Sequence, residues 1–376
     1  MSDRAPFRRA AEELRANAEQ WQAYQSTGHA VLLAGPGSGK TKTLTIKLAR
    51  MLAEDVEEPR GVACITYSNE CARELETRLA GLGVEPGARV FVGTVHSFSL
   101  TQILLPHASQ LGLGLPEDIR VATAYQRRGS LDRAYARVIT GSSNPENIRS
   151  SMDRYRRSFL DRTSRSWRET NLQLANLVEA YEADLRAQGI IDMEDMPLLA
   201  LRALETNSWL AQALAAKYPI LAVDEYQDLG RALDQMVQTL CFGAGTRLLA
   251  VGDVDQSIYG FTGAYPELLR RVSERPDVEM VRLGLNYRSG SHIVTASEYA
   301  LGEERGYRAP DDAHEGTVYF HSRSGNYSAQ ARYAMRNLLS EIEERRTGIA
   351  RGEIAILYPA YWLGDELAAA AANEGI

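Results

Sequence analysis

The chain alternates short apolar runs with longer stretches in which apolar residues return every three or four positions. Nearly continuous apolar runs are typical of strands that are buried on both faces of a parallel sheet, and such runs lie at residues 29–33, 62–66, 90–92, 220–223 and 248–251. Helical spacing follows the first run, with apolar residues at Leu44, Leu48, Met51 and Leu52. Strand and helix in alternation predict an α/β fold with a parallel sheet.

The alternation stops between about residues 100 and 215, where nearly the whole stretch has a helical pattern. A clean amphipathic stripe, ended by Gly189, consists there of Leu174, Leu177, Val178, Tyr181 and Leu185. The simplest interpretation is one α/β domain, residues 1–100 and 215–285, that is interrupted by a helical insertion at residues 101–214.

A second α/β unit is predicted for residues 286–376. Its candidate strands are residues 317–320 and 354–357, each followed by a helical pattern, and the last helix is rich in alanine. Two strands are too few for an independent doubly wound sheet. We therefore expect this second unit to be incomplete.

Composition narrows the class of protein. The 376 residues carry a net charge of −7, with 24% charged and 44% hydrophobic residues, which is ordinary for a globular chain of two or three domains. This charge argues against coating of nucleic acid by bulk electrostatics and is compatible with a local basic channel. No apolar run approaches about 18 residues and no secretory leader pattern is present, so we expect a cytoplasmic protein without membrane contact. The three cysteines lack zinc spacing and are predicted to be small buried residues.

The segment from Ala34 to Thr41 reads AGPGSGKT and lies between a predicted strand and a predicted helix. Its glycines let backbone N–H groups turn inward around phosphate oxygens, and the N-terminus of the following helix adds partial positive charge. Lys40 is predicted to reach the β- and γ-phosphates, and the hydroxyl of Thr41 to hold Mg²⁺. The strict pattern G-x-x-x-x-G-K-[ST] fails only at Ala34. The segment predicts a nucleoside triphosphate site with contacts from Gly35, Gly37, Ser38, Gly39, Lys40, Thr41 and Lys42.

Two further polar segments directly follow apolar strands. Asp224 and Glu225 come after residues 220–223, where one carboxylate can orient Mg²⁺ and its neighbour can polarise an attacking water. We assign Asp224 to the metal and Glu225 to the general base. Gln256 follows residues 248–251, where an amide can donate to a γ-phosphate and accept from water. The alternative is that Asp224, Glu225 and Gln256 are solvated loop residues without a catalytic role. The presence of the phosphate loop disfavours this alternative.

With four more segments, these residues resemble the UvrD/Rep/PcrA-type superfamily 1 DNA helicases. The segments run in the order of that family and extend over nearly the whole chain, at residues 17–20, 34–41, 66–72, 93–98, 224–228, 252–264 and 286–289. The resemblance implies a RecA-like P-loop motor domain with a helical insertion and the start of a second RecA-like domain. It also implies that Gln20 reads the adenine edge of ATP, that Tyr287 stacks on the base and that Arg288 contacts the γ-phosphate.

For single-stranded DNA, the resemblance implies a path near Tyr67, Asn69, His96, Tyr259 and Phe261. Stacking on aromatic side chains tolerates any base, which suits a motor that must hold and release each base in turn. Core packing is the alternative for a lone aromatic residue. The chain departs from the family at Phe261 and Thr262, where tryptophan and arginine are usual, and at Leu285, where glutamine is frequent.

Residues 127–168 contain 11 arginines and no lysine against four acidic residues, a local balance of +7 in a chain of net charge −7. The stretch lies in the predicted insertion, which flanks the DNA path in the family. Arginine can pair with phosphates through two hydrogen bonds. We hypothesise that Arg154, Arg156 and Arg157 contact a DNA backbone; a solvated helix face is the alternative.

The leading hypothesis is an ATP hydrolase with Mg²⁺ that acts as a 3′-to-5′ translocase or helicase on single-stranded DNA or at a junction of single- and double-stranded DNA. The later family segments have no counterpart, so we expect this chain to lack the C-terminal motifs that unwinding needs. The alternative is a non-motor ATP-binding module in a repair or defence complex, with a nuclease or repair factor as protein partner. We expect a monomer. A P-loop kinase or GTPase is disfavoured because it leaves Gln20, Tyr287 and residues 94–96 unexplained.

Overall fold

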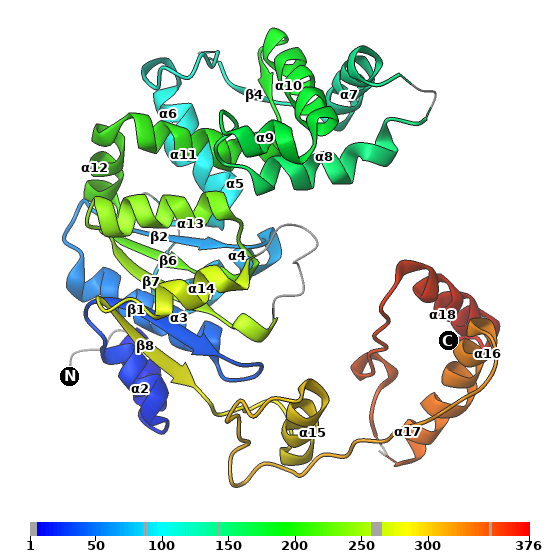
Figure 1. The fold of residues 1–376 in the computed structure, drawn as a ribbon. Helices are drawn as coiled ribbons and strands as arrows, with labels where there is room; N and C mark the ends of the chain where they lie inside the picture. Colours follow the sequence, from blue (N-terminus) through cyan, green and yellow to red (C-terminus); the bar gives the residue numbers. More distant parts are fainter. Residues whose placement is uncertain are drawn as a thin grey trace. The chain divides into compact units, whose positions relative to one another are not determined.

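A parallel sheet of six strands is the centre of the larger of two compact units, residues 1–316 and 317–376 (Figure 1). The computed structural model describes residues 6–85, 87, 89–116, 118–140, 143–256, 265–345 and 348–376. In spatial order the strands are β3 (Val90–Thr94), β2 (Val62–Thr66), β6 (Ile220–Val223), β7 (Arg247–Gly252), β1 (His29–Ala34) and β8 (Val278–Leu283). The five predicted strands and the predicted α/β class are confirmed, and β8 is an addition at the edge beside β1.

The strands are apolar throughout because the sheet has a hydrophobic core on each face. Alternate residues of a strand point to opposite faces, so that Val31 packs in one core while Ala30 and Leu32 pack in the other. The first core is closed by α11 (Met196–Thr206), α12 (Ser208–Lys217), α13 (Arg231–Val237) and α14 (Pro266–Ser273). The second is closed mainly by α3 (Lys40–Arg50) and α4 (Asn69–Gly81). The apolar stripe predicted after the first strand is buried at Leu44, Leu48 and Met51, the last of which begins the π-helical turn η1 (Met51–Asp55).

The N-terminal helical pattern forms two helices, α1 (Pro6–Leu14) and α2 (Ala18–Gln25). They separate at Asn17, whose side-chain oxygen accepts the backbone N–H groups of Glu19 and Gln20 at 2.9 and 3.0 Å. Asparagine is a preferred N-cap because its side chain satisfies a donor that the helix leaves free. This cap fixes where α2 begins and therefore where Gln20 points.

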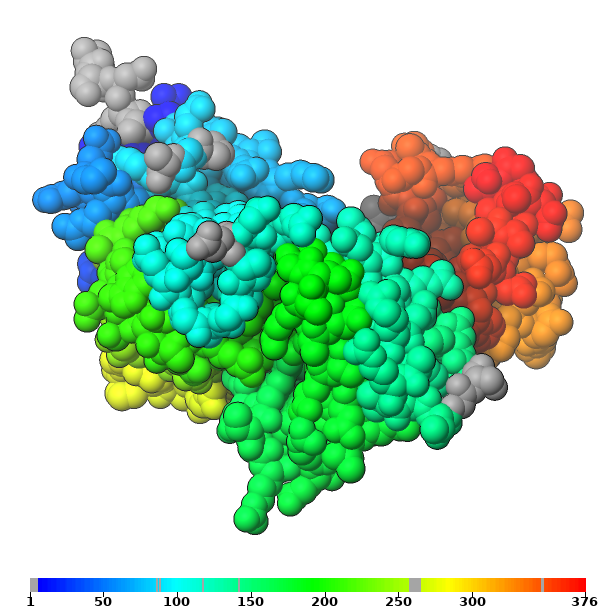
Figure 2. Space-filling model, turned by 90° about the horizontal axis from the view of Figure 1, so that it is seen from above, coloured from blue at the N-terminus to red at the C-terminus, as the bar shows by residue number. Residues whose placement is uncertain are grey.

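The chain between β3 and β6 is almost wholly helical, as predicted, and its helices form much of the face of the larger unit seen in Figure 2. Besides α11 and α12, these helices are α5 (Val95–Phe98), α6 (Leu105–His107), α7 (Ala124–Val138), α8 (Glu146–Ser158), α9 (Arg165–Thr170) and α10 (Leu172–Ala187). Two short strands, β4 (Arg120–Val121) and β5 (Ile190–Ile191), pair in parallel. In the stripe of α10, Leu177, Val178, Tyr181 and Leu185 are buried against α7, α8 and α9, and the turn after α10 contains Gly189 at a φ of 68°.

The arginine-rich stretch is largely neutralised inside the insertion. Arg156 is 2% exposed, and its guanidinium lies within 3.3 Å of four carboxylates, those of Asp153, Glu182, Asp192 and Asp195. Ion pairs also engage Arg127, Arg133, Arg137, Arg149, Arg157, Arg162 and Arg168. Burial makes the hypothesis of DNA contact wrong for Arg156. Arg157 is paired with Glu194 at 2.8 Å, so it too is engaged within the protein.

The smaller unit is helical around a small core. Its helices are α16 (Tyr327–Tyr333), α17 (Leu339–Arg345) and α18 (Tyr361–Asn373), and its core contains Ala331, Met335, Leu339 and Ala370. Residues 317–320 and 354–357 form no strand, so both candidate strands are wrong. A strand requires a hydrogen-bonded neighbour, and neither segment has one among the described residues. Phe320 and Leu357 are consequently 93% and 94% exposed. The predicted boundaries of the insertion and of a second domain stay a prediction.

Cys64 and Cys241 are buried, Cys71 is partly exposed, and all three are free thiols. Of the helices that the structure describes, none combines the length with the hydropathy that a membrane span requires.

Lys47 of α3 is a fully buried lysine whose titration makes the stability of the fold depend on pH. Its ammonium donates to the carbonyl and hydroxyl oxygens of Ser26 at 2.6 and 2.7 Å, at the C-terminal end of α2. Burial, with the nearby Arg50 adding to the shift, lowers the pKa of Lys47 from its ordinary value of 10.5 to about 7. Between these pH values the unfolded state binds more protons, so the free energy of unfolding rises with pH.

We expect Lys47→Met to remove this contribution, so that the wild type gains stability over the variant as pH rises from 7 to 10.5. Urea unfolding of both proteins across this range measures the difference. A difference that does not change with pH would show that Lys47 keeps its ordinary pKa in the folded protein.

Candidate nucleotide-binding site and adjoining pocket

The carboxyl ends of three neighbouring strands bring the predicted nucleotide site together. In the sheet, β6 pairs with β7 and β7 pairs with β1, all in parallel. Residues 35–41 follow β1, residues 253–256 follow β7, and residues 224–228 follow β6. Ligands of open α/β sheets bind at the carboxyl ends of their strands, and the strand order explains how side chains 185 positions apart, such as Lys40 and Glu225, come into contact.

The phosphate loop has the backbone that its glycines permit. Gly37 and Gly39 have φ values of 70° and 80°, in the left-handed region that glycine adopts without strain. Gly39 is the N-cap of α3, so the first free N–H groups of that helix follow it directly. Two side-chain hydrogen bonds help to hold the loop: the Ser38 hydroxyl donates to the Gly35 carbonyl at 2.7 Å, and the Gln20 amide donates to the Ser38 carbonyl at 2.9 Å. This is a preformed cradle of backbone donors suited to an anion.

We expect Gly37→Ala to reduce the free energy of unfolding by about 1–3 kcal/mol, the cost of a left-handed backbone in a residue other than glycine. A Cβ at this position would also lie 2.4 Å from Asn286 Oδ1 and 2.6 Å from Arg288 Cβ. The matched control is Gly28→Ala, because no described heavy atom lies within 4 Å of that Cβ. Urea unfolding of the three proteins tests this, and equal stabilities would mean that the loop does not hold the described conformation.

The side chain of Lys40 contacts residues of both other segments, 224–228 and 253–256. Its ammonium donates to Glu225 Oε2 at 3.3 Å and to Gln256 Oε1 at 3.4 Å. Gln256 is oriented in turn by Asp253, whose Oδ2 accepts the amide at 2.7 Å. Glu225 has a φ of 50°, the only positive value among the described residues other than glycine. Such backbone strain persists where the surroundings fix it, often at functional sites. A cation, a carboxylate and an amide therefore converge at the point where the sequence predicts a γ-phosphate and its attacking water.

Asp224 is suited to a divalent cation. It is 4% exposed, and its Oδ1 has no hydrogen-bond partner among the described residues. Burial, reinforced by the adjacent Glu225 and opposed by Lys40, raises its pKa to about 7. Within the described chain no cluster of three or more acidic, histidine or cysteine side chains could hold a metal alone. Mg²⁺ is typically bound by one or two protein ligands together with substrate phosphates and water, so the donor set of Asp224 and the predicted Thr41 fits this ion.

The Gln20 side of the site is linked to the Tyr287 side by hydrogen bonds. Asn17 donates its amide to the Tyr287 hydroxyl at 2.9 Å, and the Tyr287 backbone N–H donates to the Gly37 carbonyl at 2.9 Å. Tyr287 is 50% exposed, so its ring is accessible to a base. The backbone of Arg288 donates to Asn286 Oδ1 at 2.9 Å, and its side chain is exposed. These predicted residues therefore border the phosphate loop.

Lys42 is not brought into this group. Its ammonium pairs with Glu13 Oε2 at 2.6 Å, on the side of α3 that faces α1. Its predicted contact with the nucleotide stays a prediction.

Sequence reasoning misses a segment that borders the phosphate loop. The ring of Tyr307 lies 2.4 Å from the position that a Cβ on Gly35 would take. Arg305 pairs with Asp255 at 3.3 Å, beside Gln256. Glu298 Oε1 accepts the backbone N–H groups of both Arg305 and Tyr307 at 3.1 and 3.2 Å. A single aromatic residue in a polar loop carries no sequence signal for this contact.

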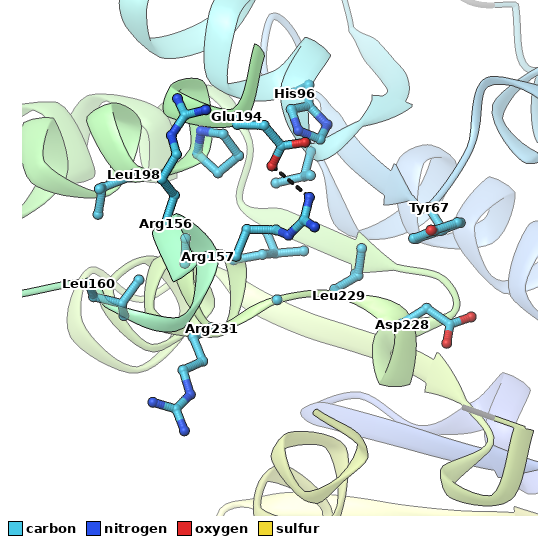
Figure 3. A pocket seen from close by; sticks show the side chains of 15 residues that line it. Tyr67, His96, Arg156, Arg157, Leu160, Glu194, Leu198, Asp228, Leu229 and Arg231 are labelled. Carbon is cyan, nitrogen blue, oxygen red and sulfur yellow. Dashed lines mark hydrogen bonds and ion pairs between the residues drawn. The ribbon is translucent and has the colours of Figure 1, made fainter. Parts of the chain in front are cut away.

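A pocket of about 360 Å³ adjoins the site, where β2 and β3 end beneath the insertion. Figure 3 shows Tyr67 and His96 on its wall, with the ion pair between Arg157 and Glu194 beside His96. Burial lowers the pKa of His96, with Glu194 opposing and Arg157 adding to the shift. The imidazole is therefore neutral at physiological pH and offers a flat ring rather than a charge. Asp228 lines the same pocket and belongs to the segment that carries Glu225.

Of the other residues predicted on the DNA path, Asn69 is exposed at the first position of α4, after the N-cap Ser68. Tyr259 and Phe261 lie outside the described residues.

Comparison with known proteins agrees with the geometry. The family described as UvrD/REP helicase N-terminal domain matches residues 16–277, and the chain belongs to this family. It is 30% identical over 311 residues to the ATP-dependent DNA helicase Rep of Escherichia coli, an alignment that covers 77% of this chain and 43% of the relative. It is 28% identical over 360 residues to the ATP-dependent DNA helicase PcrA of Leuconostoc citreum, covering 91% of this chain and 46% of the relative. The ATP-dependent DNA helicase UvrD2 of Mycobacterium bovis is 28% identical over 303 residues, covering 74% and 42%. The chain thus spans less than half the length of these relatives.

Proposed function

We propose that this chain is the ATP-binding core of a DNA translocase or helicase that acts on single-stranded DNA. The observation that carries the proposal is the convergence of Glu225 Oε2 and Gln256 Oε1 on the ammonium of Lys40, at 3.3 and 3.4 Å. The relatives named ATP-dependent DNA helicases support it. The unit that binds the nucleotide would be residues 1–100 with 215–285, with the insertion at 101–214 and the start of a second domain at 286–376.

In this proposal the backbone N–H groups of residues 37–41 hold the phosphates, and Lys40 neutralises charge that develops on the transferred phosphoryl group. Glu225 accepts a proton from the attacking water, and the Gln256 amide orients that water. Lys40 donates to both of these side chains. A γ-phosphate that drew the Lys40 ammonium toward itself would leave Glu225 and Gln256 free to contact the water.

Mg²⁺ would be held by Thr41 and Asp224, and it supplies charge neutralisation on the phosphate oxygens when bound. The observation that supports a cation here is that Asp224 Oδ1 is buried and has no hydrogen-bond partner among the described residues. An unpaired buried oxygen costs stability, so a cation at this position would stabilise the folded protein.

The pocket of about 360 Å³ that Tyr67 and His96 line, the Tyr67 pocket, would receive a base of single-stranded DNA. Stacking, rather than edge-specific hydrogen bonds, would hold the base. Tyr67 and the neutral ring of His96 line it, together with apolar Val95, Leu160, Leu198 and Leu229. In the arginine-rich stretch, Arg128, Arg154 and Arg165 are exposed and have no ion-pair partner among the described residues, so they are the candidates for phosphate contact.

Equilibrium binding of a fluorescent ATP analogue with Mg²⁺ tests the nucleotide part. We expect saturable binding that Lys40→Ala weakens at least about tenfold, the equivalent of one charge-assisted contact of roughly 1.5–3 kcal/mol. The control is Lys217→Ala, which also removes one lysine charge. Lys217 donates to Gln102, and neither residue belongs to the phosphate loop. Equal affinities for wild type and Lys40→Ala would contradict the proposal.

A further inference from the structure

Gln227 has a buried side-chain amide that lies between Glu225, the candidate catalytic carboxylate, and the Tyr67 pocket. Both its oxygen and its nitrogen form hydrogen bonds. Its side chain is 1% exposed. Its Oε1 accepts the backbone N–H of Asp253 at 3.0 Å, and its Nε2 donates to Glu225 Oε2 at 2.8 Å. The same Nε2 is 3.5 Å from Asp228 Oδ2. One side chain therefore contacts the ends of two adjacent strands and two carboxylates.

The local backbone is built for this amide. Gln227 lies in the 3-10 turn η5 (Tyr226–Asp228), which directly follows the strained Glu225. Across from it, Gly252 ends β7, and a Cβ there would lie 2.4 Å from Gln227 Oε1. Only glycine leaves room for the amide at this place. The amide oxygen of Gln227 is thus held in place by the Asp253 N–H, whereas the amide nitrogen lies between the two carboxylates of Glu225 and Asp228.

The two carboxylates that share the nitrogen face different ligand sites. Glu225 Oε2 also accepts from Lys40 of the phosphate loop at 3.3 Å. Asp228 lines the Tyr67 pocket, and its other oxygen, Oδ1, is buried without a hydrogen-bond partner in the described part of the chain. The 3.5 Å contact to Asp228 is the longer of the two, so it is the contact that a change in the pocket would alter first.

We propose that Gln227 is a positioning residue that couples occupancy of the Tyr67 pocket to the orientation of Glu225. A single-stranded DNA segment in the pocket brings phosphate charge near Asp228, which repels its carboxylate and lengthens the 3.5 Å contact. The amide, anchored at Asp253, then donates to Glu225 alone. The two arrangements differ in their hydrogen bonds at both sites, which is the requirement for two ligands to be coupled through one element.

This inference rests on the proposed function, and a linkage experiment separates the two. The dissociation constant of a fluorescent, non-hydrolysable ATP analogue is measured for the 376-residue chain with and without a saturating oligothymidylate. Coupling between two sites typically changes affinity by about 5- to 150-fold, and the oligothymidylate affinity must change by the same factor when the nucleotide is added. Gln227→Leu removes both the amide oxygen and the amide nitrogen. We expect the coupling factor, the ratio of the two dissociation constants with and without the second ligand, to fall to about 1 in this variant. Each ligand alone should bind Gln227→Leu within about threefold of wild type, because Gln227 is neither part of the phosphate loop nor among the residues that line the Tyr67 pocket.

A second variant and a control test this interpretation. Asp228→Asn removes the charge at the pocket end and should weaken coupling, with no further loss in the double variant Gln227→Leu/Asp228→Asn because both act on one link. Gln173→Leu, an exposed glutamine of α10, is the matched control and should keep wild-type coupling. A turnover assay adds a second readout, in which Gln227→Leu lowers the DNA-stimulated kcat and leaves the KM for ATP within about threefold.

The outcomes are distinct. Wild type that binds neither nucleotide nor oligothymidylate overturns the proposed function. Wild type that binds both without mutual influence overturns the coupling and leaves the binding function intact. Retention of the wild-type coupling factor in folded Gln227→Leu, or in Asp228→Asn, also overturns the role of Gln227.

Discussion

Glutamine in place of Glu225 should lower ATP turnover by about 10²–10⁴-fold, the typical contribution of a positioned general base. The amide keeps the size of the carboxylate but cannot accept a proton from water. Lys40, which donates to Glu225 Oε2 at 3.3 Å, loses a charged partner and becomes freer to meet the phosphates. We therefore expect the affinity for ATP to stay the same or to increase while kcat falls.

Single-turnover and steady-state hydrolysis, together with equilibrium binding of an ATP analogue, separate these effects. Glu169→Gln, an exposed glutamate of α9, is the control for loss of one negative charge. Retention of most of the wild-type kcat in Glu225→Gln would assign the base to another group. A parallel loss of binding would instead indicate that Glu225 is needed to build the site.

Methionine in place of Arg156 should reduce the free energy of unfolding by about 3–5 kcal/mol, the cost of leaving buried charges without their partner. The guanidinium lies within 3.3 Å of Asp153, Glu182, Asp192 and Asp195. Burial would raise the pKa of Glu182, but Arg162 and Arg156 outweigh this and lower it to about 2. Without Arg156 these carboxylates repel one another in a buried space, and the insertion should unfold more easily than the sheet.

Urea unfolding followed by tryptophan emission suits this test because Trp167 is fully buried in the core of the insertion. Arg78→Met is the control, since Arg78 forms an exposed pair with Glu74 on α4 and should cost less than about 1 kcal/mol. If Arg156→Met were no less stable than Arg78→Met, the four carboxylates would not depend on Arg156 for their burial.

The sheet could be predicted where burial on both faces leaves an unbroken apolar run. The strand β8 escapes this reasoning because it lies at an edge of the sheet, with β1 as its one neighbour among the described strands. Its residues Val278, Val281 and Leu283 are buried while Glu279, Met280 and Arg282 are exposed, so no continuous run exists. Residues 317–320 show the opposite failure. They are apolar enough for a strand, but hydrophobicity records a preference for burial and not the presence of a partner strand.

The meeting of the three polar segments could be predicted because each is short and directly follows a strand of the sheet. Lys40, Glu225 and Gln256 meet as the carboxyl-edge rule requires. The contacts of Gln227 and Tyr307 could not be predicted, since they depend on which loops pack against each other.

The count of charges in residues 127–168 was misleading for a similar reason. Glu182, Asp192 and Asp195, which neutralise Arg156, lie outside that window of sequence. The net charge of +7 therefore describes the sequence window alone, because in the folded protein acidic residues from outside the window neutralise part of it.

One measurement decides whether these segments form a motor core: steady-state ATP hydrolysis by the 376-residue chain in Mg²⁺, with increasing oligothymidylate, for wild type and Lys40→Ala. We predict turnover that rises with oligothymidylate to a plateau and is lost in Lys40→Ala. Turnover that is absent, or that is unchanged by both the oligothymidylate and Lys40→Ala, would contradict a DNA-coupled nucleotide site in this chain.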